Sequence, residues 1–510
     1  MVSFALSLIA LLLGYVFYSR LVVKVFQPDD RPTPAVTMAD GIDYVPMPTW
    51  KIFMIQFLNI AGTGPIFGAI MGAWYGPAAY LWIVFGCIFA GAVHDYFSGM
   101  LSMRHGGRDI PELVGAYLGK KAKAFMLFFA TFLLVMVGVV FVFSPALILG
   151  DYCLNTLVWV GIIFVYYLLA TLLPIDKIIG KIYPIFGFSL LFMAVALMVC
   201  LFIKQPRLPE VWDSAAAFNF NVPQSMLGVK NYFEHNPLFP CLFLTIACGA
   251  ISGFHATQSP LMARCLKSEK HGRVVFYGAM ITEGVVALIW ATVSMYFFYY
   301  GGWKQVVDAN VVNDFLNQYQ HAGGKTLVQF FSAPKVVEYI CTGWLGIFGG
   351  ILAVFGVVAA PITSGDTAFR SARLIIAEAF HFNQKPISNR LFVAIPMFLM
   401  AFGLLAWQIA DPNGFNKLWN WFGWSNQTLA CFTLWTITVY LVQEKKCFWM
   451  TLIPSLFMTT VCSTFLFVST QAFGDWIPRP WGYALGLFFL LLSLVWFITW
   501  YRGRASQQHV

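Results

Sequence analysis

Long apolar runs, separated by short polar connections, dominate the chain from end to end. A helix needs roughly 20 mainly apolar residues to cross the hydrocarbon core of a bilayer, and thirteen runs meet that requirement. They cover residues 3–25, 51–72, 77–102, 123–147, 155–173, 182–203, 239–262, 275–300, 338–362, 389–410, 424–443, 447–468 and 480–501. Each run is continuously apolar, whereas the strands of a membrane barrel alternate with a period of two. The pattern therefore predicts about thirteen transmembrane helices.

The composition excludes a soluble fold. Of the 510 residues, 59% are apolar and 10% are charged, while soluble chains carry roughly 25% charged residues. A soluble fold of this composition would expose large apolar patches to water, so we expect an all-α integral membrane protein that lies in the lipid bilayer. The ten cysteines form no CxxC pair and most lie inside apolar runs. We therefore predict buried thiols, and no metal or other resident cofactor.

The cations predict an orientation in the membrane. If the amino terminus lies outside, 23 of the 31 Lys and Arg residues fall in cytoplasmic stretches and 8 fall on the outer side. Cytoplasmic loops carry the excess of positive residues in membrane proteins. The distribution thus favours an outside amino terminus, a cytoplasmic carboxyl terminus and an odd number of helices. It also accounts for the net charge of +9, so we expect no nucleic-acid partner.

The order of the helices fits an inverted repeat. Without the first helix and the last two, two groups of five remain, and because five is odd the groups have opposite orientations. Each group opens with a helix rich in glycine and small polar residues, Asn59–Gly68 in the first and Thr245–Pro260 in the second. The predicted division is a leading helix with a cytoplasmic linker (1–50), a first repeat (51–204), a second repeat (205–443) with outer loops 205–238 and 301–337, and two closing helices with a cytoplasmic tail (444–510).

We predict that both opening helices are interrupted at a substrate site. Gly62, Gly64 and Pro65 weaken helix propagation and free backbone groups. A membrane tolerates such backbone only where it is buried or lines a cavity. Close helix packing is the alternative, because glycines let helices approach one another. The candidate substrate-binding residues are Asn59, Gly62, Thr63, Gly64, Ser252, Gly253, His255, Thr257 and Gln258.

Acidic residues inside the apolar runs are costly and usually functional. Asp95, Glu283 and Asp366 are therefore candidates for taking up and releasing a coupling proton. The alternative is that each forms a structural ion pair, with partners such as Arg104, Arg370 and Arg373.

Two hydroxyl residues, Thr363 and Ser364, follow Pro361, which we expect to interrupt the ninth helix. Paired hydroxyls beside freed carbonyls suit a hard cation such as sodium. Alternatively, both hydroxyls bond back to their own helix.

Histidine occurs twice within the predicted spans, at His94 and His255. We interpret His255 as a hydrogen-bonding group at the interrupted helix, and haem ligation by the two histidines is the alternative. The sequence contains no Walker loop, HExxH or GxSxG motif, so no familiar enzyme chemistry is indicated. We expect a transporter rather than an enzyme, or else a membrane sensor that binds the same ligand without transport.

Three segments closely resemble the carbon starvation protein A (CstA) family, namely Gln56–Glu112, Ser252–Leu266 and Gly365–Leu374. The resemblance covers most of residues 1–380 and weakens beyond them. It implies a bacterial inner-membrane transporter linked to nutrient limitation, with peptide uptake in some members and proton-coupled pyruvate import in close relatives.

The same resemblance implies the amino acid–polyamine–organocation superfamily and its LeuT-like 5+5 inverted repeat. In that fold the first helix of each repeat is broken around the substrate, and a sodium site uses paired hydroxyls on the eighth helix, here Thr363 and Ser364. We therefore expect import of a small carboxylate such as pyruvate, or of short peptides, coupled to protons or sodium. The half-helix amino termini around Gly62–Gly64 and Gly249–Gly253 would face anionic groups of the substrate.

Overall fold

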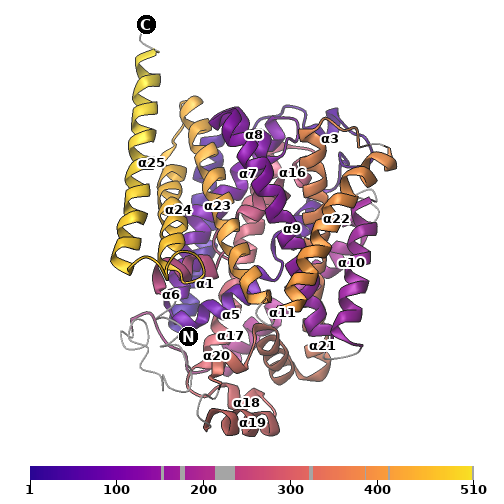
Figure 1. Cartoon of the computed structure of the whole chain (residues 1–510), viewed down its shortest axis with the longest axis vertical. Coiled ribbons are helices and arrows are strands. Elements are labelled where there is room, and N and C mark those ends of the chain that lie inside the picture. Colours follow the sequence, from indigo (N-terminus) through magenta and orange to yellow (C-terminus); the bar gives the residue numbers. More distant parts are fainter. Residues whose placement is uncertain are drawn as a thin grey trace.

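The computed structural model describes residues 1–150, 154–172, 179–212, 236–320, 325–384, 386–411 and 414–507. In these ranges every regular element is helical, and the long helices run side by side as one bundle (Figure 1). The short helices α18 (Trp303–Val306) and α19 (Ala309–Gln320) lie at one end, which we call the α19 end. Helices α3 (Pro34–Thr37) and α8 (Ile110–Leu118) lie at the opposite end, which we call the α3 end. The amino terminus lies toward the α19 end and the carboxyl terminus at the α3 end (Figure 1).

Nine helices in the described ranges are long and apolar enough to cross a membrane. They are Val2–Phe26, Ala78–Arg104, Lys120–Gly150 (α9), Tyr183–Lys204 within α11 (Ile179–Lys204), Glu269–Phe298, Gly349–Ala379 within α21 (Ala333–Ala379), Ile387–Ala410 (α22), Trp449–Val468 (α24) and Arg479–Arg504 within α25 (Arg479–Gln507). The bent pair Thr49–Ile60 and Gly64–Tyr75 raises the count to ten. The prediction of an all-α, multi-pass membrane protein is confirmed.

Several of these spans are built from consecutive elements. The elements are α1 (Val2–Leu13), η1 (Gly14–Tyr18) and α2 (Ser19–Phe26); α6 (Ala78–Gly86), η4 (Cys87–Gly91) and α7 (Ala92–Arg104); and η5 (Glu269–His271), η6 (Arg273–Gly278) and α17 (Ala279–Phe298). The other predicted segments correspond to α10 (Thr156–Leu172), to the pair α15 (Leu238–Thr245) and α16 (Gly253–Ala263), and to α23 (Gly414–Gln443). Every one of the thirteen predicted ranges thus overlaps helical structure, although only nine or ten helices meet the length and hydropathy requirement in the described chain.

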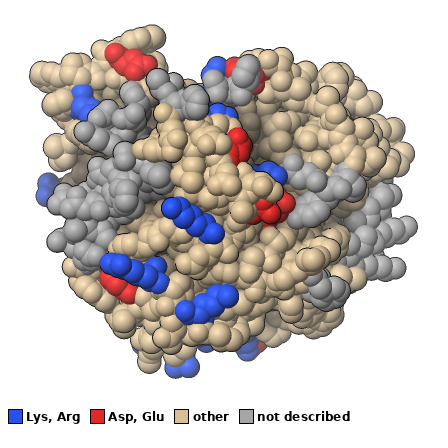
Figure 2. Space-filling view, turned by 90° about the horizontal axis from the view of Figure 1, so that it is seen from below, with Lys and Arg blue, Asp and Glu red and all other residues tan. Residues whose placement is uncertain are grey.

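The outward faces of the bundle are apolar. Large side chains such as Phe128 on α9, Phe392 on α22 and Trp496 on α25 are 71%, 67% and 61% exposed. Charged residues are sparse on the α19 end as well, where Lys and Arg lie among mostly uncharged atoms (Figure 2). Apolar side chains without protein neighbours are stable in contact with lipid, as expected for a membrane protein. The polar connection 301–337 carries α18, α19 and α20 (Leu327–Phe330), while most of 205–238 lies outside the described residues.

Pro361 does not interrupt its helix, so that prediction is wrong. Helix α21 continues through Pro361, and its non-helical residue is Gly346, with φ +69°. Glycine adopts this left-handed region without steric cost. A proline lacks the amide hydrogen that would bond to the carbonyl four residues earlier, here that of Val357. A membrane helix tolerates this loss where it is packed within the protein. Here Tyr167 of α10 contacts the same turn, with its hydroxyl 3.0 Å from the Pro361 carbonyl and 2.9 Å from that of Phe141 in α9.

Both predicted interruptions in the opening helices are present. Helix α4 (Thr49–Ile60) ends before residues 61–63, and the chain resumes as η2 (Gly64–Gly68), α5 (Ala69–Gly72) and η3 (Ala73–Tyr75), with a bend of 53°. Helix α15 ends at Thr245, and α16 begins only at Gly253. The two interrupted helices cross at these points, because a methyl group on Gly64 would collide with Cys248 and one on Gly68 would meet the Thr245 carbonyl at 2.6 Å. The glycines of these segments have two interpretations from the sequence, as helix interruptions or as sites of close helix packing. The structure shows both at the same place.

Candidate functional site

The first interruption is surrounded by buried polar side chains without partners. Gln56, Asn59 and Thr63 are 0% exposed, and in the described part of the chain none of their side-chain nitrogen or oxygen atoms forms a hydrogen bond. Buried polar groups are nearly always satisfied in proteins, by protein atoms, water or a ligand. Asn59 and Thr63 were expected here from the sequence, whereas Gln56, one helical turn before Asn59, was not. This group has the hydrogen-bonding capacity to hold a polar ligand.

The second interruption is instead held by α23. Asn426 Oδ1 accepts a hydrogen bond from the Phe254 amide at 2.7 Å and from the Ser252 hydroxyl at 3.1 Å. It thereby caps the start of α16, since an oxygen acceptor satisfies an amide that has no partner in the first turn of a helix. Gly253 lies against the backbone of Asn426 and Ala430, where a Cβ atom would collide with both. Of the two predicted anion-facing helix termini, this one already has a protein acceptor.

The interruptions lie beside a buried ionic cluster, which we define as His94, Asp95, His255 and Glu283. His94 Nδ1 lies 2.8 Å from Asp95 Oδ1, and His255 Nδ1 lies 2.9 Å from Asp95 Oδ2. Because a carboxylate only accepts, each Nδ1 carries the hydrogen. His255 Nε2 then faces Glu283 Oε2 at 3.4 Å. All four side chains are 0% exposed.

This geometry brings two of the predicted acids, Asp95 on α7 and Glu283 on α17, to opposite sides of the predicted His255 on α16. The alternative that Asp95 pairs with Arg104 is wrong, because Arg104 binds Glu269, with Nη2 3.0 Å from Oε2. Both histidines place Nδ1 against the same carboxylate, which is the hydrogen-bonding role that the sequence indicated for His255.

The cluster contains two carboxylates and two imidazoles, and an imidazole is positive only when it is protonated. If only one imidazole carries a proton on both nitrogens, it offsets one of the two carboxylates. The other is then an uncompensated charge in a dry, low-dielectric interior, at a cost of several kcal/mol. In the described chain neither oxygen of Glu283 receives a hydrogen bond. The arrangement is therefore suited to hold a proton on Glu283 while the site is closed.

A metal ion could also be ligated at this point. The Cys248 thiol, the His255 imidazole and the Glu283 carboxylate offer ligand atoms that all lie within 4.8 Å of one another. Cys248 belongs to the interruption itself, between α15 and α16. No CxxC or HExxH pattern marks this group along the chain, because its members come together only through the fold.

Asp366 belongs to a different environment. Its Oδ2 lies 2.7 Å from the Tyr183 hydroxyl of α11, and the described residues include no cation bound to it. The predicted alternative of pairing with Arg370 or Arg373 is wrong, because both guanidiniums approach Asp43 instead, each at 3.7 Å. The sequence could not indicate this contact, since Asp43 lies far away in the linker before α4.

The paired hydroxyls have different partners. Thr363 Oγ1 bonds back to the Ala360 carbonyl at 2.7 Å, as the alternative expected. Ser364 Oγ instead donates to the Leu58 carbonyl in α4 at 3.1 Å, close to the first interruption. Neither residue lies at a helix break, because α21 is continuous here. Only Ser364 therefore reaches the interrupted helix.

Thr257 and Gln258 lie about one turn into α16, after the second interruption, and connect this helix to α21. Thr257 Oγ1 bonds to the Phe254 carbonyl at 2.6 Å, and the Gln258 amide lies 2.9 Å from Thr257 Oγ1 and 3.4 Å from Ser371 Oγ. Gln258 Oε1 has no hydrogen bond in the described residues. The side chains of Thr257 and Gln258 therefore form hydrogen bonds within the protein, whereas that of Asn59 forms none in the described chain.

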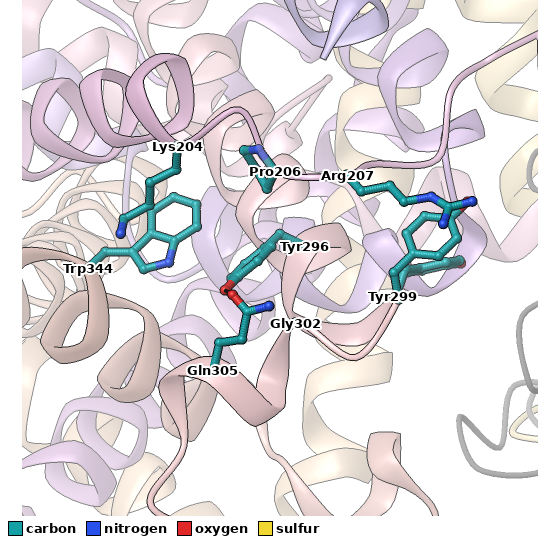
Figure 3. Close-up of a pocket in the computed structure, with 9 residues that line it drawn as sticks. Lys204, Pro206, Arg207, Tyr296, Tyr299, Gly302, Gln305 and Trp344 are labelled. Carbon is teal, nitrogen blue, oxygen red and sulfur yellow. Dashed lines mark hydrogen bonds between the residues drawn. The ribbon is translucent and has the colours of Figure 1, made fainter.

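Two cavities lie toward the α19 end. A small one, of about 40 Å³, lies between the halves of the interrupted helices nearer that end, with Met71, Thr245 and Trp419 in its lining. A larger one, of about 320 Å³, is lined by cations and aromatic rings, including Lys204, Arg207 and Trp344 (Figure 3). The latter lies at the ends of α11 and α17, away from the ionic cluster.

Comparison with known proteins places the chain in a family. The sequence model described as Carbon starvation protein CstA matches residues 1–149 and 146–465. "Peptide transporter CstA" of Campylobacter jejuni is 27% identical, over 88% of this chain and 77% of its own length. An "Uncharacterized membrane protein" of Haemophilus influenzae is 46% identical over 58% of this chain and 91% of its own length.

Among solved structures, the Eremococcus coleocola manganese transporter aligns with a TM-score of 0.53 at 14% identity. The alignment covers 91% of this chain and 99% of that one, so the two proteins share a fold. With the family match extending over both interruptions and the ionic cluster, the chain belongs to the Carbon starvation protein CstA family.

Proposed function

We propose that the protein is a secondary active transporter that imports a small carboxylate, such as pyruvate, or short peptides, coupled to protons and used under nutrient limitation. The observation that carries this proposal is the juxtaposition of two interrupted helices with the Asp95–His255–Glu283 arrangement. Relatives across several bacteria are named peptide transporters, and the shared fold is that of a transporter.

The proposed topology has thirteen transmembrane helices, with a LeuT-like 5+5 inverted repeat, one helix before it and two after it. The two interrupted helices support the repeat, because each is the opening helix of its group and they cross at matching points. The termini lie toward opposite ends of the bundle, as an odd number of crossings requires (Figure 1). With the excess of cations placed inside, the α19 end faces outward and the α3 end faces the cytoplasm of a bacterial inner membrane.

Substrate binding would begin at the first interruption. Asn59, Gln56 and Thr63 present amide and hydroxyl groups that have no partner in the described chain. The start of η2 at Gly64 adds a positive dipole end, which favours an anionic group. The Gly62 amide, in contrast, already donates to the Ile60 carbonyl at 3.0 Å. Both interruptions are in contact, so a ligand here also touches the α15–α16 segment that carries His255.

Proton coupling would use the ionic cluster. With Glu283 neutral and one positive imidazole beside Asp95, the cluster carries no net charge in the closed site. When the pathway opens to the cytoplasm, water solvates Glu283 and its proton is released. A charged Glu283 then opposes closure until it is protonated again, because a lone buried charge is costly. Asp366, which binds Tyr183, would have a smaller role than Asp95 and Glu283.

Uptake into proteoliposomes tests this proposal. We expect pyruvate or a dipeptide such as alanyl-alanine to accumulate when an inward proton gradient is imposed, and not when the gradient is collapsed by a protonophore. Accumulation that follows an imposed sodium gradient alone would move the coupling to a sodium site, for which the contact of Ser364 with the Leu58 carbonyl is the structural support. Binding of these compounds without accumulation under either gradient would indicate a sensor instead.

A further inference from the structure

The cavity at the outer ends of α11 and α17 combines positive charge with buried aromatic surface. Its lining consists of Lys204, Pro206, Arg207, Tyr296, Tyr299, Tyr300, Gly302, Gln305 and Trp344, and includes no acidic residue. Figure 3 shows Lys204 and Arg207 on either side of Pro206, with the Tyr296 ring between them. Tyr296, Tyr299 and Trp344 are buried, whereas both cations are exposed. The cavity therefore has an apolar floor and a cationic rim.

The two cations have no stronger partner among the described residues. The Arg207 guanidinium lies 4.3 Å from the centre of the Tyr300 ring, and Lys204 Nζ lies 6.0 Å from the centre of the Trp344 ring. Stacking on a ring orients a guanidinium and leaves the donors at its edge available. A carboxylate would form charge-assisted hydrogen bonds with these donors, which are stronger than bonds between neutral groups.

The size of the cavity limits what it can take. Its volume is about 320 Å³, near the lower end of ligand pockets, which run from about 300 to 1,000 Å³. A small organic acid or a dipeptide fits such a space, whereas a long peptide does not. The Tyr296 hydroxyl and Gln305 Oε1, which lie 3.0 Å apart at one wall, add polar groups for a neutral part of the ligand.

This cavity is separate from the ionic cluster but connected to the interrupted helices. Tyr296 follows Glu283 by thirteen residues on α17, which places it roughly 20 Å further along the helix axis. The hydroxyl of Tyr299 donates to the Trp74 carbonyl at 3.1 Å, and Trp74 belongs to η3, at the end of the first interrupted helix. A ligand in the cavity thus contacts Tyr299, which is hydrogen-bonded to the end of the first interrupted helix.

We propose that this cavity is an entry site that binds the carboxylate of the incoming substrate through Lys204 and Arg207 before it reaches the interrupted helices. The proposal rests on the proposed import of a carboxylate or peptide, and it restricts the substrates to molecules with a free carboxylate. Positive charge at the mouth of a pathway also raises the local concentration of anionic substrates.

Transport kinetics give the first test, with Arg207→Gln, Lys204→Gln and the double variant. We expect the double variant to raise KM for alanyl-alanine by roughly tenfold or more, because hydrogen bonds to charged groups are lost, while the maximal rate is retained. The matched control is Lys304→Gln, which removes a cation at the same end that contacts the Trp303 ring and does not line the cavity. An unchanged KM in the double variant, or an equal rise with Lys304→Gln, would overturn the proposal.

Labelling gives a second test that needs no transport. In a chain with Cys153→Ser, Cys200→Ser and Cys447→Ser, the variant Gln305→Cys, which lines the cavity and keeps both cations, is treated with a membrane-impermeant, anionic thiol reagent from outside. We expect alanyl-alanine to slow labelling by roughly threefold or more and alanyl-alanine amide, which lacks the carboxylate, to give no protection. The control Lys304→Cys should be labelled at the same rate with and without the dipeptide.

The two tests separate the entry site from the proposed function. Protection of Gln305→Cys in a protein that shows no gradient-driven uptake would retain the entry site and reject the transport mechanism. Uptake without protection, or equal protection by the amide, would retain transport and reject the carboxylate entry site.

Discussion

The two interrupted helices have similar local sequences but differ in what surrounds them. At the first interruption the polar side chains of Gln56, Asn59 and Thr63 are buried without hydrogen bonds to the described chain. At the second, Asn426 satisfies the backbone and the Ser252 hydroxyl, and His255 is held by Asp95. Glycine, threonine and serine thus interrupt both helices, while long-range contacts decide their roles. The first is suited to bind a ligand, and the second to transmit a change of charge.

The largest expected effect is at the second interruption, through Glu283→Gln. For one proton per substrate, a gradient of two pH units supports roughly 100-fold accumulation, since each tenfold ratio corresponds to about 1.4 kcal/mol. Glu283→Gln removes the exchangeable proton, so we expect the accumulation ratio in proteoliposomes to fall to about one while exchange of substrate at equal pH continues. The control is Asp366→Asn, whose carboxylate binds Tyr183 away from the cluster. Equal loss in both variants, or full accumulation by Glu283→Gln, would contradict the assigned role.

Glycine substitutions compare how tightly the two interruptions are packed. A Cβ atom on Gly253 would collide with backbone atoms of Asn426 and Ala430, whereas one on Gly62 would meet the Phe141 ring at 2.9 Å and Ser364 Oγ at 3.1 Å. Side chains can shift more easily than backbone. We expect Gly253→Ala to lower the free energy of unfolding by about 1–3 kcal/mol and Gly62→Ala to lower it by less. Thermal unfolding in detergent measures both, and the reverse order would show that the first interruption is the more rigid one.

Removal of an amide side chain separates the two proposed roles. Asn426→Ala leaves the Phe254 amide and the Ser252 hydroxyl without their acceptor, which costs about 1–2 kcal/mol. Asn59→Ala removes a side chain that has no hydrogen bond in the described chain, so we expect less loss of stability and a higher KM for uptake. The melting temperature and the KM for uptake, measured for both variants under the same conditions, distinguish a structural role from a ligand-binding role. If Asn59→Ala destabilises the protein as much as Asn426→Ala and leaves KM unchanged, the first interruption is structural.

The smallest expected effect is on the contact between α21 and the first interrupted helix. Ser364→Ala removes the hydrogen bond from Ser364 Oγ to the Leu58 carbonyl, which is worth about 1 kcal/mol. For a proton-coupled transporter we expect this change in stability and no change in the response to sodium. The measurement is uptake with sodium replaced by choline, in wild type and in Ser364→Ala. A sodium dependence that disappears in the variant would assign the cation to this position.

The interruptions could be predicted because their causes are local. Gly62, Gly64 and Pro65 weaken any helix, and the small polar residues near Ser252 do so in the same way. The same argument failed at Pro361, because α21 is packed against neighbouring helices there, and Tyr167 of α10 contacts this turn at the Pro361 carbonyl. Whether a proline breaks a membrane helix depends on its neighbours in space.

The candidate acids could be found from the cost of burying a charge, but their partners could not. Asp95 and Glu283 are 188 positions apart in the chain, and only the fold brings both to His255. Arg370 and Arg373, which are one and two turns after Asp366 on α21, approach Asp43 of the linker instead. Asn426 lies in a polar stretch of α23 that the sequence shows clearly, yet its role as a cap depends on α16, which precedes it by more than 160 residues. These contacts are set by packing between distant helices.

The direct crossing of the two interruptions has a consequence for how this protein can vary. Gly64 lies against Cys248, Gly68 against the Thr245 carbonyl, and Gly72 against Ile246, with no space between them for an added methyl group. A larger residue at Gly64 therefore requires a smaller one at Cys248. Positions 64 and 248 should change together among homologous chains, and Gly64→Ala combined with Cys248→Gly should recover stability that Gly64→Ala alone loses.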